Sequence, residues 1–244
     1  MATYPVPNDV QLNLLWERFG QSSDLGVREK LIILSAVEMA KVGTLEFNAK
    51  NPCEAIGAKS SMVNYYFGGR EGLMAEAAIF VYQDWIHSVQ KCLSTKESDP
   101  VSQIKKIIDS DLEFTQRWGH MAVFASYPNS SPKLREIYHE RFESIAQEGL
   151  EYYLAVLAIL ISDARAGRKS RIDFSIGNLP KSKLAANAPA LLAATSLSWS
   201  ISGLTIWSAG QHIASSNLEK KFKTSLTTKV AMRNHINHII NSFL

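Results

Sequence analysis

Apolar residues recur along most of this chain every three or four positions, which is the spacing of amphipathic helices, and they hardly ever alternate with polar residues as in a strand. The pattern predicts an all-α fold. Two short helices are expected between Gly43 and Gly68, one beginning at Asn51 and one over 60–66. Eight further helices are expected at 8–19, 25–42, 70–93, 100–118, 120–126, 131–165, 189–214 and 218–243. Residues 167–187 lack a period and contain glycine, proline and charges, so they are expected to form a loop.

The start of the first short helix has strong capping signals. Asn51 is a good N-cap, Pro52 suits the first helical position, and Glu54 can complete a capping box. Gly57 follows soon afterwards, so this helix must be short.

The two short helices have the residue types that close packing across a tight turn requires. Cys53 is small, Gly57 four positions later permits the turn, and Val63 six residues further on can face the first helix. Phe67 is expected in the core. This pattern is typical of a helix-turn-helix.

The flanking residues make the pattern more specific. Residues 28–73, above all Tyr65-Tyr66-Phe67 followed by Arg70-Glu71-Gly72-Leu73, resemble the N-terminal domain of TetR-family transcriptional regulators. The resemblance implies an N-terminal extension with a short helix at 1–22, a three-helix DNA-binding domain at 23–70, and an effector-binding and dimerisation domain at 71–244.

Five positions depart from the family pattern. The family usually has an aliphatic residue at the position of Pro52 and alanine at the position of Cys53. It usually has tyrosine where this chain has Asn64, histidine where it has Tyr66, and lysine where it has Arg70. Tyrosine and arginine keep a hydrogen-bonding or cationic group, whereas Asn64 shortens a side chain that in relatives often reaches a phosphate.

The second short helix and its neighbours are the predicted DNA-binding surface. Lys59, Tyr65, Tyr66 and Arg70 are expected to contact the DNA backbone, and Ser61 and Met62 to face base edges. One of the two tyrosines can instead simply pack with Phe67. The complete predicted set is Lys50, Lys59, Ser60, Ser61, Met62, Asn64, Tyr65, Tyr66 and Arg70.

Charge leaves an alternative open. Residues 1–70 contain seven lysines and arginines and seven acidic residues, so this region lacks the overall basic character of many DNA binders. A helical protein–protein interaction module that has lost DNA binding is therefore the alternative. The most basic stretch is 165–183, which is interpreted as a solvated loop, with an accessory DNA or partner contact as the other reading.

Composition argues against several other classes of protein, such as disulfide-rich, secreted and membrane-spanning proteins. The chain has 244 residues, 46% hydrophobic residues, 20% charged residues and a formal net charge of +3, as in ordinary globular proteins. Two cysteines cannot build a disulfide framework, and the first ten residues do not resemble a signal peptide, so a cytoplasmic location is expected. The uncharged stretch 184–218 is rich in serine and threonine and is expected to form a buried helix rather than a membrane span.

No sequence feature indicates an enzyme, a cofactor or a metal. Phosphate loops, dinucleotide fingerprints and nucleophile motifs are missing from the sequence. His235 and His238 have helical spacing but no third ligand. The pairs Asp109/Asp111 and Glu140/Glu143 are interpreted as solvated helix faces.

Aromatic residues after residue 71 suggest a pocket for a small apolar or aromatic effector. Tryptophan and tyrosine suit such a pocket because each joins a large ring to a polar group. The predicted lining is Tyr82, Trp85, Phe114, Trp118, Phe124 and Tyr152. His87, Gln116 and His120 are candidate polar anchors.

The last two helices are predicted to form a homodimer interface. The helix over 189–214 is apolar or small nearly all round, and one monomer has a single core for it to face, so its other side should meet a partner. The predicted contacts are Leu197, Ile201, Leu204, Phe222, Leu226 and Val230. The expected function is a dimeric repressor that an effector releases from a near-palindromic double-stranded DNA operator.

Overall fold

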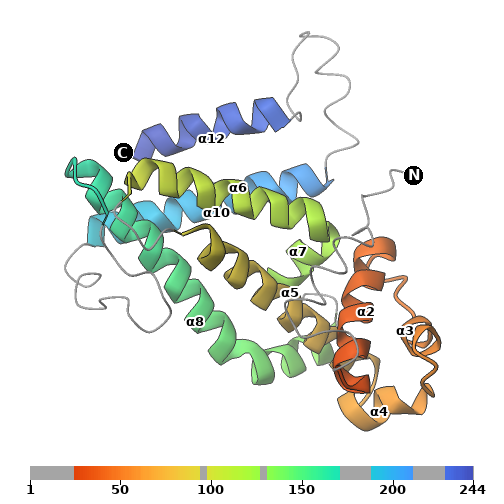
Figure 1. Ribbon diagram of the computed structural model, residues 1–244. Coiled ribbons are helices and arrows are strands. Elements are labelled where there is room, and N and C mark those ends of the chain that lie inside the picture. The colour runs from red at the N-terminus through yellow and green to blue at the C-terminus, as the bar shows by residue number, and fades with distance from the viewer. Residues whose placement is uncertain (1–24, 94–97, 127–130, 171–187, 211–228, 244) are drawn as a thin grey trace. The chain divides into compact units, whose positions relative to one another are not determined.

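The computed structural model describes residues 25–93, 98–126, 131–170, 188–210 and 229–243. These residues form nine α-helices and no strand, so the predicted all-α fold is confirmed (Figure 1). Their bounds are α2 (Val27–Val42), α3 (Lys50–Ala55), α4 (Ser61–Phe67), α5 (Arg70–Cys92), α6 (Pro100–Trp118), α7 (His120–Ser126), α8 (Pro132–Arg165), α10 (Ala188–Gly210) and α12 (Lys229–Phe243). One isolated antiparallel bridge joins Ser98 and Ser170.

The predicted helices agree with these bounds to within one or two residues wherever the structure describes both ends. The predicted helix at 8–19 lies outside the described residues, as do most of the expected loop, the end of the helix at 189–214 and the start of the helix at 218–243. Among the described helices, α10 included, none has the length and apolar character needed to cross a bilayer.

The chain divides into two compact units, and the division differs from the boundary expected after residue 70. The first unit comprises 1–85 and 114–146, and the second comprises 86–113 and 147–244. Helices α5, α6 and α8 each contribute residues to both units. The first unit therefore contains α2, α3 and α4 together with the first part of α5, the last part of α6, all of α7 and the first part of α8.

In the first unit, α2 packs against α3 and α7. Glycines end α2 and α4 because the chain adopts a positive φ there, 84° at Gly43 and 70° at Gly68. Arg28 at the start of α2 forms an ion pair with Glu76 of α5, at 3.1 Å, and its guanidinium carbon lies 5.6 Å from the centre of the Phe67 ring. These contacts connect α2 with α4 and α5.

The predicted capping of α3 at Asn51 is wrong, because the helix begins one residue earlier. The side-chain oxygen of Asn48 accepts a 3.1 Å hydrogen bond from the backbone N–H of Lys50, and Asn51 uses its amide to bond Glu38 of α2 at 2.6 Å. Pro52 is buried at the third helical position, where a backbone N–H would still have no partner within the helix.

Larger helices complete the first unit's core. Trp118 at the end of α6 is completely buried and lies edge-on to Phe80 of α5, with ring centres 6.0 Å apart. The hydroxyl of buried Tyr138 in α8 donates to the carbonyl of Ala125 in α7, which connects these two helices.

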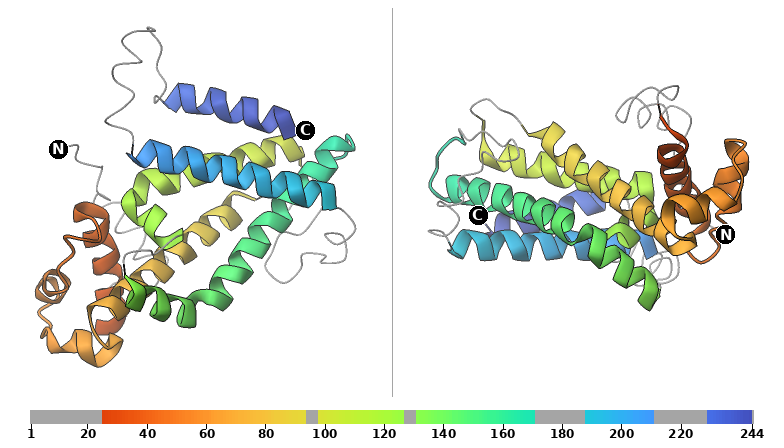
Figure 2. Two further views of the ribbon diagram at one scale, coloured as in Figure 1. Left: turned by 180° about the vertical axis from the view of Figure 1, so that it is seen from behind. Right: turned by 90° about the horizontal axis from the view of Figure 1, so that it is seen from below.

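In the second unit, α10 and α12 run side by side (Figure 2). Small and aliphatic residues of α10 at helical spacing are buried, which are Ala190, Ala193, Ala194, Leu197 and Ile201. In α12, Ile236 and Ile240 are buried one turn apart, while His235 and His238 are exposed.

Candidate nucleic-acid interface

The side chains that sequence analysis assigned to the packing of α3 and α4 all lie inside the protein. Cys53, Val63 and Phe67 are all buried. The chain turns at Gly57, which has a φ of 66°, and the N–H of Ala58 donates to the carbonyl of Cys53 at 2.9 Å. A hydrogen-bonded turn with a positive φ at Gly57 therefore follows α3 and leads towards α4.

The opposite side of α4 is open to solvent. Ser61, Asn64 and Tyr65 are exposed, and Tyr65 retains 78% of its possible exposure. Met62 and Tyr66 are half-buried, and the rings of Tyr65 and Tyr66 meet edge to face with centres 4.9 Å apart. The helix thus presents hydroxyl, amide and phenol groups on a single face.

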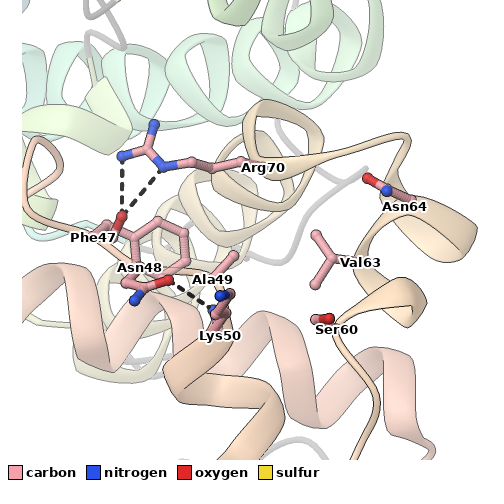
Figure 3. A pocket seen from close by; sticks show the side chains of 8 residues that line it. All are labelled: Phe47, Asn48, Ala49, Lys50, Ser60, Val63, Asn64 and Arg70. Carbon is pink, nitrogen blue, oxygen red and sulfur yellow. Dashed lines mark hydrogen bonds between the residues drawn. The ribbon is translucent and has the colours of Figure 1, made fainter.

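A groove of about 350 Å³ separates the first turn of α4 from the segment that leads into α3 (Figure 3). Its apolar floor comes from Phe47 and Val63, which are buried, and its polar rim includes Lys50, Ser60 and Asn64. Ser60 precedes α4, but its hydroxyl makes no capping hydrogen bond to the helix. That hydroxyl therefore remains available to a ligand.

The cationic charge around the groove is modest. Residues 50–67 contain two lysines and one acid, all exposed, so their net charge is +2 − 1 = +1. Neither Lys50 nor Lys59 forms an ion pair with another described residue, whereas Arg28 is engaged with Glu76. A polyanion bound here would depend on neutral donors as well as on the two lysines.

Arg70 lines the groove, but its guanidinium is largely occupied within the protein. Its Nε donates to the carbonyl of Phe47 at 3.2 Å, and Nη2 donates to the carbonyls of Phe47 at 3.2 Å and Thr44 at 2.9 Å. The side chain is half-buried and lies over the Phe47 ring at 5.6 Å. Sequence reasoning placed Arg70 at the right site but did not foresee these two carbonyl partners.

The predicted effector-pocket residues fall into both units. Tyr82, Phe114, Trp118 and Phe124 are buried in the first unit, where Trp85 is half-buried, and Tyr152 is buried in the second. The rings of Tyr82 and Trp85 lie edge to face, with centres 5.2 Å apart.

The polar groups beside these rings are not the predicted ones. His87 and Gln116 are exposed, so they are not buried anchors, and the side chain of His120 lies outside the described residues. A buried carboxylate of the first unit, Asp84, accepts a 2.9 Å hydrogen bond from Nε1 of Trp118 and lies 3.6 Å from Arg117. Its position one helical turn after buried Phe80 was the signal that sequence reasoning overlooked.

A second buried polar cluster lies in the second unit. The hydroxyl of Tyr153 donates to the carboxylate of Asp111 at 2.6 Å. The expectation that Asp111 belongs to a solvated face is therefore wrong: α6 buries it against α8, where a tyrosine compensates for the lost water. Burial, followed by the neighbouring Asp111 charge, raises the pKa of the Cys92 thiol to about 11, and Cys92 donates to the carbonyl of Val89 at 3.0 Å.

The predicted dimer contacts need a correction. Leu197 and Ile201 are only 1% and 3% exposed, so other parts of the same chain already cover them. Among the described side chains of α10, the large exposed ones are instead Leu192 and Trp199, at 70% and 73%, two helical turns apart. The side chains of Leu204 and Val230 and all of Phe222 and Leu226 lie outside the described residues.

Within the described part of the chain, no three histidine, cysteine or acidic side chains lie together as a metal site would require. In the basic stretch, Arg165 donates to the carbonyl of Phe243 at 3.0 Å and Arg168 pairs with Asp163 at 3.0 Å. Arg171, Lys181 and Lys183 lie outside the described residues.

Comparison with known proteins assigns neither a family nor a function to this chain. No protein-family model matches the sequence, and neither the curated proteins nor the solved structures contain a match to the chain. The resemblance to TetR-family regulators therefore stays a prediction from residues 28–73.

Proposed function

We propose that this protein is a ligand-responsive transcriptional regulator of the TetR type that binds double-stranded DNA through α3 and α4. The observation that carries the proposal is the exposed polar face of α4 beside a groove whose rim includes Lys50 and Ser60. An α-helix fits the major groove of B-DNA, and serine, asparagine and tyrosine all hydrogen-bond bases or phosphates.

The proposed contacts divide into two groups. Ser61, Met62 and Asn64 would face base edges, and an asparagine amide can bond adenine in two places. Lys50, Lys59, Ser60 and the two tyrosines of α4 would contact the sugar-phosphate backbone. Because each copy of the protein brings only two lysines to the site, DNA affinity should fall only moderately as the salt concentration rises.

The regulatory part of the proposal rests on the aromatic residues of the larger helices. A small apolar or aromatic molecule would bind among residues such as Tyr82, Trp85 and Phe114 and favour a conformation with lower DNA affinity. The protein would then act as a cytoplasmic repressor that the bound molecule releases from DNA. The dimer would form through the exposed face of α10 around Leu192 and Trp199, so that two copies of α4 meet a near-palindromic operator.

The proposal is tested by selecting duplexes from a randomised pool with the full-length protein and measuring affinity for the selected duplex by fluorescence anisotropy. Asn64→Ala should lower affinity for that duplex by about tenfold to a hundredfold, the cost of one good base contact. Its effect on affinity for a duplex of unrelated sequence should be small. Lys50→Met should weaken binding to both duplexes, and Lys133→Met, at an exposed position of α8, is the matched control that should change neither.

Failure to enrich any duplex at low salt would overturn the proposal. It would favour the second candidate, a protein–protein interaction module. One observation supports that candidate, because the same unit exposes two large apolar side chains, Leu45 at 85% and Tyr65 at 78%.

A further inference from the structure

Arg70 connects three pieces of the first unit. It is the first residue of α5, it follows the two glycines after α4, and its guanidinium reaches back to the segment between α2 and α3. Its hydrogen bonds end on the carbonyls of Thr44 and Phe47, which bracket the turn at 44–46. One planar side chain thus holds both ends of a turn that has no regular secondary structure.

The segment that Arg70 holds is one wall of the groove. It continues directly through Asn48, which caps the N–H of Lys50, into α3. In Figure 3 the Phe47–Lys50 segment lies across the groove from Ser60, which precedes α4, and from Val63 and Asn64 of α4. The position of the Lys50 backbone relative to α4 therefore depends on what fixes Thr44–Phe47.

The bonds to Phe47 and Thr44 also limit what Arg70 can give to a ligand. Nε and Nη2 donate to carbonyls, and the guanidinium stacks over Phe47, so a single nitrogen, Nη1, has no hydrogen bond to another described residue. If the guanidinium bound a phosphate through two of its nitrogens, at least one hydrogen bond to a carbonyl would have to break. The carbonyls of Thr44 and Phe47 would then lose donors.

We infer that Arg70 is a positioning residue of the DNA-binding site rather than a phosphate contact. This inference rests on the proposed function and names how the site is kept in shape. Arg70 holds the 44–48 segment so that Lys50 and the groove face the DNA, and it acts on affinity through that segment.

A lysine at position 70 separates the two roles. Lysine keeps the positive charge and reaches a phosphate well, but its ammonium lacks the planar fork that bonds two carbonyls while stacking on an aromatic ring. For a positioning residue, Arg70→Lys should lower affinity for the selected duplex about tenfold while the slope of log affinity against log salt stays at the wild-type value. Lys50→Met is the contrasting variant, and it should reduce that slope by about 1.

Hydrogen exchange gives a readout that needs no DNA. Amides of residues 44–50 should exchange faster in Arg70→Lys than in the wild type, while those of buried α5 residues such as Leu73 and Met74 stay protected. Lys50→Met should leave exchange in the segment unchanged.

The outcomes for the inference and for the proposed function are distinct. If Arg70→Lys binds as the wild type does, and Arg70→Met reduces the salt slope by about 1, Arg70 is a phosphate contact and the inference is overturned. If the wild type selects no duplex, the proposed function fails instead. That result is seen before any variant is made.

Discussion

Nε1 of Trp118 donates a 2.9 Å hydrogen bond to Oδ2 of Asp84, and both side chains are completely buried in the first unit. Arg117, the residue before the tryptophan, approaches the same carboxylate oxygen at 3.6 Å from a partly exposed position. A buried carboxylate is tolerated only when it is hydrogen-bonded or paired, and here neighbouring residues at the end of α6 supply both interactions.

This arrangement predicts a large difference between two substitutions of Asp84. Asp84→Asn keeps an acceptor for the indole N–H and should cost about 1 kcal/mol in the free energy of unfolding. Asp84→Ala leaves the N–H unpaired beside a small cavity and should cost about 3 kcal/mol. Urea unfolding would measure both, and equal costs would show that the hydrogen bond to Trp118 contributes little.

Gly72 and Phe67 approach each other too closely for any other residue at position 72. A Cβ atom on Gly72 would lie 1.9 Å from the carbonyl oxygen of Phe67, which is a backbone atom that cannot move aside. Gly72→Ala should therefore displace α4 from α5 and destabilise the first unit by about 3 kcal/mol, the upper end of the usual cost of overpacking with backbone shifts.

Gly68→Ala is the matched comparison, because a Cβ there meets no atom within 4 Å and only the positive φ of 70° opposes it. The cost of that left-handed conformation is about 1–2 kcal/mol. Thermal unfolding should rank wild type above Gly68→Ala, and Gly68→Ala above Gly72→Ala. The reverse order for the two variants would contradict the close approach of α4 and α5.

The proposed homodimer can be tested on the exposed face of α10. Trp199→Glu places a charge in the centre of the expected interface and should convert a dimer into a monomer at micromolar concentration, because an unpaired buried charge opposes association strongly. Leu192→Glu should act in the same direction, and Gln116→Glu, at an exposed position of α6, should have no effect. Sedimentation velocity provides the measurement, and a monomeric wild type would exclude the interface.

The raised pKa of Cys92 predicts a pH dependence. A thiol whose pKa in the folded protein is raised stays protonated, so it contributes stability fully below its ordinary value of 9.0, and that contribution disappears as the pH rises towards about 11. At pH 8 the thiolate fraction, and hence alkylation by iodoacetamide, should be about a hundredfold lower than for an unperturbed thiol.

Cys53→Ala leaves Cys92 as the only thiol for this measurement. Alkylation should accelerate in urea, where Cys92 is solvated, and also in Asp111→Asn, where the neighbouring negative charge is gone. Equal rates in folded and urea-unfolded protein would contradict the raised pKa.

The sequence by itself determined the helices, because apolar residues at a period near 3.6 leave few other ways to bury them. Gly43 and Gly68 were predictable as helix ends for a local reason, since only glycine adopts a positive φ at little cost. The same local logic indicated that Cys53, Val63 and Phe67 are buried.

Only the tertiary structure decided which polar groups are buried and which face of a uniformly apolar helix is free. Asp84 and Asp111 resemble surface carboxylates in the sequence, and their partners Trp118 and Tyr153 are 34 and 42 residues away. In α10 nearly every position is apolar or small, so periodicity could not tell that Leu197 faces inward and Trp199 outward. Arg70 likewise gained two carbonyl acceptors 23 and 26 residues earlier in the chain, because hydrogen bonds between distant segments depend on packing that no local pattern records.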